Sequence, residues 1–210
     1  GHENDDFKKL PIRENLLARM REAGVDLSVN LPVVSKPQNQ GEVNRFAKES
    51  ARKNIISFGG LHPDCENVIE ELEKLKDMEM AGIKFHPPFQ KVHLEDPKYG
   101  EMWRKINELG FPVLIHMGTA RIVRPYDLYP SGIRKILKSA PDIPIIMAQM
   151  GSFCMMKNPN ENLENLPENV FIDTAMSAEL EEAGEFEEIV RKFGTKRVLY
   201  GCDFPYGSQK

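Results

Sequence analysis

The stretch AGIKFHP, residues 81–87, alternates apolar and polar side chains. Successive side chains of an extended strand point to opposite faces, so Ile83 and Phe85 share one face while Lys84 and His86 share the other. A charged residue and a histidine therefore stand together at the carboxyl end of an otherwise apolar strand. In a closed barrel of parallel strands this polar pair would face the mouth, where such folds keep their reactive groups.

Short apolar runs of this kind recur along the chain, with amphipathic, charge-rich segments between most of them. The predicted strands are residues 25–32, 54–63, 81–87, 111–118, 143–151, 169–176 and 197–205. Apolar spacing of i, i+3 and i+4 predicts helices at residues 13–24, 41–54, 63–78, 97–110, 131–141 and 177–194. Residues 152–169 are rich in Asn and contain two prolines, which favours a loop with a short helix at most.

Strands that alternate with helices at this cadence predict a parallel sheet covered by helices. An open doubly wound sheet usually carries a G-x-G-x-x-G turn, and this sequence has none. A (β/α)8 TIM-like barrel instead takes single reactive residues from the ends of many strands. Such residues stand at the predicted strand ends: His62, Lys84, His86, His116, Gln149 and Asp203. We therefore expect an α/β chain that forms one barrel domain over residues 1–210.

Composition narrows the range of partners. The chain has 210 residues, 40% of them hydrophobic, and a formal charge of −4 with no basic face, so a nucleic-acid partner is not expected. No apolar run approaches the roughly 20 residues that span a bilayer, and the opening GHENDDFKKL is too acidic and polar for a signal peptide. The three cysteines are far apart and form no C-x-x-C pair, which favours a reducing cytoplasm.

The strand ends suggest a shared site. By the same alternation, His116 shares a face with Leu114, and Gln149 shares a face with Ile145 and Met147. Each strand is then expected to be apolar until its last inward position, where it becomes polar. A buried polar group without a partner costs about 1–3 kcal/mol, so several at one end of a sheet predict a common site. Three of these residues also suit ordinary turn or surface positions, and that reading stays open: His62, Lys84 and His86.

Four motifs together, GIKFHP, PVLIHMG, AQMG and LYGCDFP, resemble the amidohydrolase-related metal-dependent hydrolases of TIM-barrel fold. This family includes enzymes of the aminocarboxymuconate-semialdehyde decarboxylase type, and the similarity runs from about Leu16 to Pro205. The resemblance implies a divalent metal, zinc or alternatively manganese, held by His-x-His on strand one, a histidine ending strand five and an aspartate ending strand eight. His116 and Asp203 match the last two positions, and His2 is the candidate for the first.

The metal would lower the pKa of a bound water to about 7. Asp203 is then the catalytic group expected to take the proton of that water.

The sequence departs from the family pattern in two places. Gln149 stands where the family keeps a histidine on strand six, and a glutamine amide cannot accept a proton, although it can hydrogen-bond a substrate. No I-D-x-H-x-H strand precedes Leu16, and seven predicted strands cannot close an eight-stranded barrel. We expect strand one and the helix after strand eight to be incomplete, leaving strands two and eight as open edges.

The resulting hypothesis is a metal-dependent hydrolase acting on a small, carboxylated or cyclic substrate. The expected substrate-binding residues are Lys84, His86, Gln149, His62, Arg121 and Arg124. A guanidinium binds carboxylates in a bidentate manner, which suits Arg121 or Arg124 to a substrate acid group. Three alternatives stay open: a nonoxidative decarboxylase, a metal-free lactonase, and an inactive barrel that acts as a binding protein. A homo-oligomer also stays open.

Overall fold

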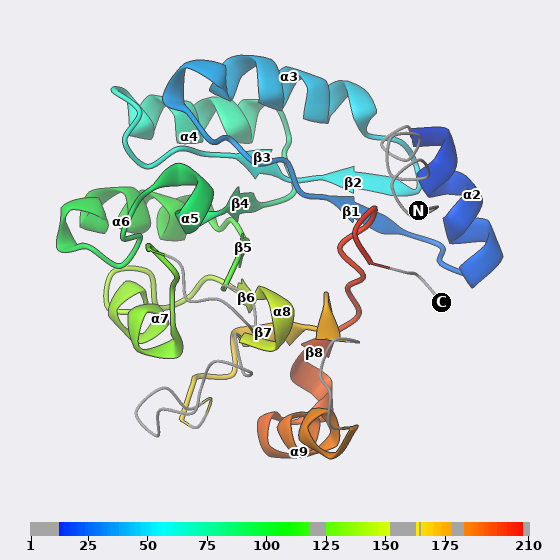
Figure 1. Ribbon diagram of the computed structural model, residues 1–210. Helices are drawn as coiled ribbons and strands as arrows, with labels where there is room; N and C mark the ends of the chain where they lie inside the picture. Colours follow the sequence, from blue (N-terminus) through cyan, green and yellow to red (C-terminus); the bar gives the residue numbers. More distant parts are fainter. Residues whose placement is uncertain (1–12, 118–124, 152–162, 164, 178–182, 208–210) are drawn as a thin grey trace.

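Parallel strands form a curved sheet in the computed structural model, which describes residues 13–117, 125–151, 163, 165–177 and 183–207 (Figure 1). The strands are β1 (Ser28–Asn30), β2 (Ile55–Ser57), β3 (Gly59–Gly60), β4 (Ile83–Phe85), β5 (Val113–Ile115), β6 (Ile145–Met147), β7 (Val170–Asp173) and β8 (Val198–Leu199). One sheet pairs β1 with β2, and a second runs in the order β3-β4-β5-β6-β7-β8. All seven predicted strands are confirmed.

Helices cover the outer side of the curved sheet (Figure 1). The main ones are α2 (Arg13–Ala23), α3 (Gln40–Ser50), α4 (Val68–Asp77), α6 (Gly100–Leu109), α7 (Pro130–Ile136) and α9 (Ala183–Phe193). A helix is present in each predicted region, although its bounds differ from the prediction: the short 3-10 helix η2 (Pro97–Tyr99), for example, occupies the predicted start of α6. A one-turn helix after β4, α5 (Pro87–Gln90), was not predicted. The predicted (β/α) barrel architecture is confirmed.

The predicted strand at residues 54–63 changes partners at Phe58, which is why it appears as β2 and β3. The backbone N–H of Phe58 donates to the carbonyl of Asn30, whereas that of Gly59 donates to the carbonyl of Gly82. The Phe58 ring lies against Gly82, where an added Cβ would stand 2.5 Å from Cζ of the ring. Gly82 is therefore required by close packing at the point where the two sheets meet.

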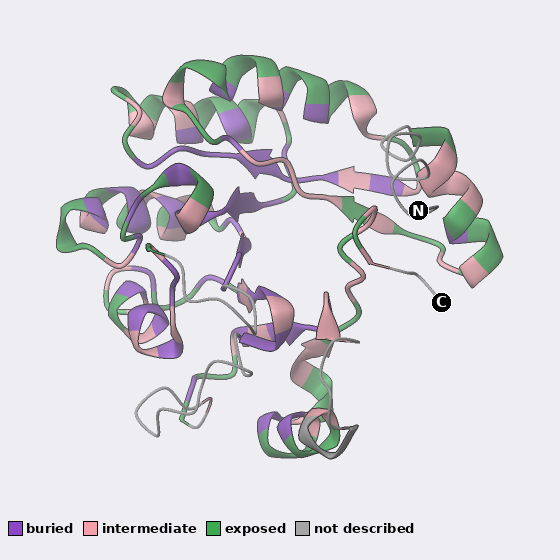
Figure 2. Ribbon diagram, viewed as in Figure 1, coloured by how far each residue is buried: buried purple, intermediate pink, exposed green. Residues whose placement is uncertain are grey.

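The strands in the middle of the sheet are buried (Figure 2), and their apolar side chains belong to two separate clusters. The outer cluster lies between strands and helices and includes Ile83 and Phe85, as alternation predicts. The inner cluster consists of Phe58, Leu114 and Ala148, with Leu31 and Ile146 packed against it. This arrangement leaves Lys84 on the inner face.

One predicted facing is wrong. Ile145 and Met147 belong to the outer cluster, so the face that Gln149 was expected to share with them is not the inward face. Strand β6 ends at Met147, and the chain then adopts left-handed backbone angles at Gln149 (φ 57°, ψ 50°) and Met150 (φ 55°, ψ 28°), within the short α8 (Ala148–Gly151). Strand alternation stops applying at that bend.

The sheet has two edges in the part of the chain that is described, because no pairing there joins β8 to β1. Large apolar side chains are exposed along these edges: Leu27, Val29, Leu199 and Tyr200. No described helix combines the length and apolar character needed to cross a bilayer.

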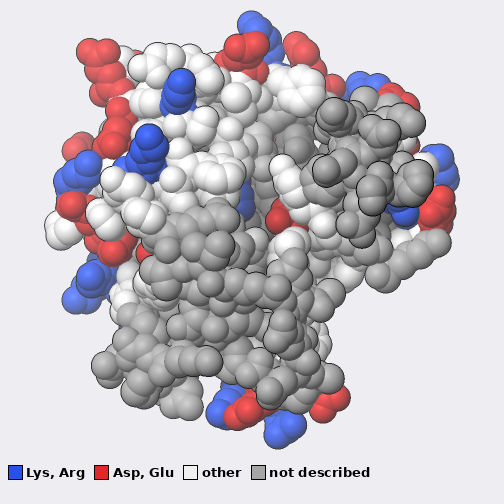
Figure 3. Space-filling model, in the orientation of Figure 1, with Lys and Arg blue, Asp and Glu red and all other residues white. Residues whose placement is uncertain are grey.

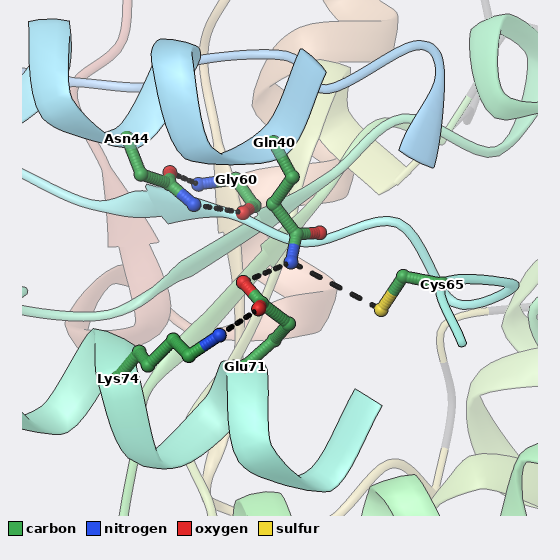
Figure 4. Close-up of polar contacts among 6 residues, drawn as sticks. All are labelled: Gln40, Asn44, Gly60, Cys65, Glu71 and Lys74. Atoms are coloured by element: carbon green, nitrogen blue, oxygen red, sulfur yellow. Dashed lines mark hydrogen bonds and ion pairs between the residues drawn. The ribbon is translucent and has the colours of Figure 1, made fainter. Parts of the chain in front are cut away.

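Buried amides of α3 hold the helix to the sheet (Figure 4). The side-chain Nδ2 of Asn44 donates to the carbonyl of Gly60 at 2.9 Å, and the Gly60 N–H donates to Asn44 Oδ1 at 2.8 Å. One turn earlier in the same helix, Gln40 Nε2 donates to Glu71 Oε2 on α4 at 2.8 Å. These bonds join α3 to the end of β3 and to α4.

We expect Asn44→Ala to lower the free energy of unfolding by about 2–6 kcal/mol, because two buried backbone groups lose their partners at about 1–3 kcal/mol each. Chemical denaturation measures the change. Arg45→Ala, on the exposed side of the same helix, is the control and should change stability by less than about 0.5 kcal/mol. An Asn44→Ala value as small as the control would contradict this account.

Candidate functional site

Lys84 lies on the inner face of β4 and is only 7% exposed. Burial lowers the pKa of its ammonium to about 8, and the negative charges of Asp173 and Asp203 partly oppose that shift. A buried lysine is costly unless anionic groups surround it. Lys84 is therefore part of a charged group and is not the surface lysine that the sequence left open.

Asp203 follows β8 and stands at the rim, where the residue is exposed to solvent. Partial burial of its carboxyl group raises its pKa, while Lys84 and a hydrogen bond with the Gln149 side chain lower it. A carboxylate only accepts hydrogen bonds, so the amide nitrogen of Gln149 is the donor. Gln149 Oε1 is buried and accepts no hydrogen bond within the described part of the chain.

Asp173, at the end of β7, is a member of this group that the sequence reasoning missed. It is 6% exposed, and burial raises its pKa. Its Oδ1 accepts hydrogen bonds from the backbone N–H groups of Gln149 (2.9 Å) and Ala175 (3.0 Å). The signal was available, because Asp173 ends the apolar run VFID just as Asp203 ends LYGCD.

His86 and His116 lie together, as expected from neighbouring strands. Their rings stack with centroids 3.8 Å apart and planes 12° apart, and Phe89 stacks on His86 at 3.9 Å. Both histidines are buried, whereas Phe89 is 54% exposed. The stack extends from the buried end of β5 out to solvent.

Gln90 is a second residue that sequence reasoning missed. Its Oε1 accepts from the backbone N–H of His86 at 3.0 Å, and its Nε2 donates to the carbonyls of Val34 (3.0 Å) and Leu61 (2.6 Å). One buried side chain thus joins the segments that follow β1, β3 and β4. No strand pattern could reveal it, because Gln90 lies in the unpredicted helix α5.

His62 is placed differently from the other predicted site residues. Its Nδ1 accepts from the backbone N–H of Asp64 at 3.2 Å, and its ring also bonds the backbone of Gln90. Its own backbone N–H donates to Gln40 Oε1 at 2.8 Å. Burial is the main cause that lowers the pKa of its imidazole. These bonds fit the turn-residue reading of His62.

Three predicted site residues lie outside the described residues: His2, Arg121 and Arg124. The group that the structure does bring together consists of Lys84, Gln149, Asp173 and Asp203, with the stacked histidines on the neighbouring strands. A hollow near the middle of the face in Figure 3 shows both cationic and anionic atoms, whereas most other charged side chains in that view stand at the edge.

The donor set fits a divalent metal in chemical type but is incomplete in number. Imidazole and carboxylate, as in His116 and Asp203, suit zinc and manganese. Two carboxylates also face the single ammonium of Lys84, so an added cation would offset negative charge. Within the described ranges, however, no three His, Cys, Asp or Glu side chains are close enough to hold a metal ion. A third ligand would have to come from outside the described ranges, and the predicted ligand His2 is one of the residues outside them.

The fold and the strand-end site define a TIM-barrel enzyme class, and comparison with known proteins assigns the family. The family model described as Amidohydrolase matches residues 13–210, so the chain belongs to the amidohydrolase family. No match to the sequence is found among curated proteins.

Several solved structures share the fold. A 2,6-dihydroxybenzoate decarboxylase from Rhizobium has a TM-score of 0.72 and 18% identity, with 100% of this chain and 83% of that chain covered. A dihydroxybenzoic acid decarboxylase from Polaromonas sp. JS666, with bound manganese and the inhibitor 2-nitroresorcinol, has a TM-score of 0.69 and 17% identity. The match covers 97% of this chain and 80% of that chain. A proposed 2-pyrone-4,6-dicarboxylic acid hydrolase from Pseudomonas putida has a TM-score of 0.66 and 17% identity, with 93% of this chain and 73% of that chain covered.

We expect the Lys84 ammonium to titrate near pH 8 and not near the value of about 10.4 typical of a solvated lysine. Because Asp173 raises this pKa, Asp173→Asn should lower it further. NMR titration of the Lys84 Cε signal measures both values. Asp77→Asn, on the exposed end of α4, is the matched control. Titration of Lys84 above pH 10 would contradict the buried placement.

Proposed function

We propose that this chain hydrolyses a small carboxylated substrate at the carboxyl end of the barrel, with Asp203 as the proton acceptor. One observation carries the proposal: the buried ammonium of Lys84 and the amide of Gln149 both interact with the carboxylate of Asp203, which is exposed to solvent. Membership of the amidohydrolase family supports hydrolytic chemistry.

Lys84 is the residue suited to bind the substrate carboxylate. A cation on an apolar inner face attracts an anion more strongly than it would in water, because the local dielectric is lower. Arg121 and Arg124 remain proposed as further carboxylate ligands, through their bidentate guanidinium groups. His86 and Phe89 offer flat surfaces against which a planar or cyclic substrate would pack.

Asp203 is the residue suited to move the proton. It is accessible at the rim, and the raised pKa of its carboxyl group makes it a better base than an ordinary aspartate. It would take a proton from the attacking water and return it to the leaving group. Gln149 cannot take that proton, so its amide serves to orient the Asp203 carboxylate and a substrate donor group.

A divalent metal, zinc or alternatively manganese, is part of this proposal, with His116, Asp203 and His2 as its ligands. When bound, it would polarise the substrate and lower the pKa of a coordinated water. The same pocket without a metal corresponds to the lactonase alternative. The free thiols of Cys65 and Cys202 support the proposed cytoplasmic location.

Nonoxidative decarboxylation is the second candidate. Losing carbon dioxide requires a proton donor for the carbon left behind, and burial raises the pKa of both Asp173 and Asp203 toward that role. Release of carbon dioxide from aromatic acids, compared with cleavage of lactones, esters and amides, separates the two reactions. Absence of both would favour a binding protein.

We expect Asp203→Asn to lower kcat at least about 100-fold, because general acid–base catalysis contributes about 10²–10⁴. The measurement is turnover of whichever carboxylated substrate the above comparison identifies. Glu187→Asn or Glu187→Gln, exposed on α9, is the control for the loss of a carboxylate. An Asp203→Asn enzyme with wild-type kcat would contradict the proposed role of Asp203 as proton acceptor.

We expect about one metal ion per chain after purification with zinc or manganese, measured by elemental analysis. His116→Ala and His2→Ala should lose most of it, because each removes a proposed ligand. His93→Ala, an exposed histidine in the loop after α5, should keep the metal. Full occupancy in His116→Ala would exclude that residue as a ligand.

A further inference from the structure

The carboxyl end of β7 is bonded to the strand ends on both of its sides. Toward β6, Asp173 Oδ1 accepts from the backbone N–H of Gln149 at 2.9 Å and also from that of Ala175 at 3.0 Å. Gln149 and Met150 both have positive φ, which residues other than glycine seldom adopt. The Asp173 carboxylate therefore bonds the chain at the residue where it leaves the strand conformation.

Toward β8, Thr174 makes a reciprocal pair with Gly201. Its Oγ1 donates to the Gly201 carbonyl at 3.0 Å and accepts from the Gly201 N–H at 3.0 Å. An added Cβ at Gly201 would lie 3.3 Å from Asp173 Cγ and 3.3 Å from the Ala175 nitrogen. Glycine thus permits the close approach, and Asp203 follows two residues later with a φ of 54°.

These two sets of bonds lie next to the two residues that form the side-chain hydrogen bond of the site, Gln149 and Asp203. Gln149 follows β6 and Asp203 follows β8, and these two strands do not pair with each other, because β7 lies between them. The segment between them, residues 173–175, bonds the backbone of Gln149 on one side and that of Gly201 on the other. Its hydroxyl and carboxylate have no part in the proton transfer proposed for Asp203.

We propose that Asp173 and Thr174 are positioning residues that set the Gln149 amide against the Asp203 carboxyl group. The effect of these residues on catalysis rests on the proposed function, whereas their effect on the backbone of Gln149 and Gly201 does not. Asp173 acts by accepting backbone hydrogen bonds and Thr174 by its hydroxyl group. Asparagine at position 173 and serine at position 174 should therefore substitute, whereas alanine and valine should not.

Backbone amide hydrogen exchange tests the structural content in the full chain. We expect the Gln149 amide to exchange about tenfold faster or more in Asp173→Ala, and within about threefold of wild type in Asp173→Asn, which keeps the acceptor oxygen. The Gly201 amide should respond in the same way to Thr174→Val and Thr174→Ser. An unchanged Gln149 amide in Asp173→Ala, or an Asp173→Asn variant that behaves like Asp173→Ala, would overturn the inference.

Zinc alone is the probe for the link to the site. Removing a residue that holds a metal ligand in position typically weakens metal binding about 10–100-fold. We therefore expect Asp173→Ala and Thr174→Val to lower the affinity for zinc at least about tenfold. Competition with a chromophoric chelator measures it. Thr174→Ser should retain wild-type affinity, and Asp173→Asn, which keeps the acceptor oxygen but removes a negative charge beside Lys84, should lose less affinity than Asp173→Ala. Equal zinc affinity in all four variants would overturn the link to Asp203.

The two readouts separate this inference from the proposed function. A wild-type chain that binds no zinc would refute the metal proposal, while the amide exchange would still decide the positioning role. If Asp173→Ala does not fold, the wild-type protein decides instead. Its Gln149 and Ala175 amides must then exchange slowly, and fast exchange at both would overturn the inference.

Discussion

The buried ammonium of Lys84 is the interaction on which the candidate site depends. A cation on the inner face of a barrel strand requires anionic neighbours, and these come from the ends of β7 and β8, far away in the sequence. Asp173 is buried and Asp203 is exposed, so the same ammonium joins an interior carboxylate to one that a substrate can reach. The charge group therefore links the core of the sheet to the rim.

Buried amides hold the strand ends around this group. Asn44 and Gln40 fix α3 to β3 and its following loop, and Gln90 joins the segments after three strands. Each of these side chains pairs with backbone groups that no strand or helix satisfies, which is the usual demand at irregular backbone. Reactive side chains at the mouth are consequently carried on segments that are fixed by hydrogen bonds.

The comparisons establish a family and a fold, while the chemistry depends on the site. Similar barrels include decarboxylases and a proposed hydrolase, and one fold serves many reactions. In this chain a glutamine contacts the strand-eight aspartate, at the position where the family resemblance led us to expect a histidine. A neutral amide changes which group can carry a proton, and Asp203 is left with that role in the proposed reaction.

Sequence periodicity by itself determined the strand and helix order, the barrel class, and the opposed faces of Ile83 and Lys84. The element order and the opposed faces follow from local periodicity, which depends only on neighbouring residues, and the barrel class follows from the polar residues at the strand ends. The tertiary structure decided three further points: the inward turn of Gln149, the participation of Asp173, and the backbone bonding of His62. Each depends on hydrogen bonds between segments that are distant in the chain, and above all on the Asp173 carboxylate that binds the bend after β6. Alternation shows where a strand points, but only contacts with neighbouring strands show where it ends and how the chain then turns.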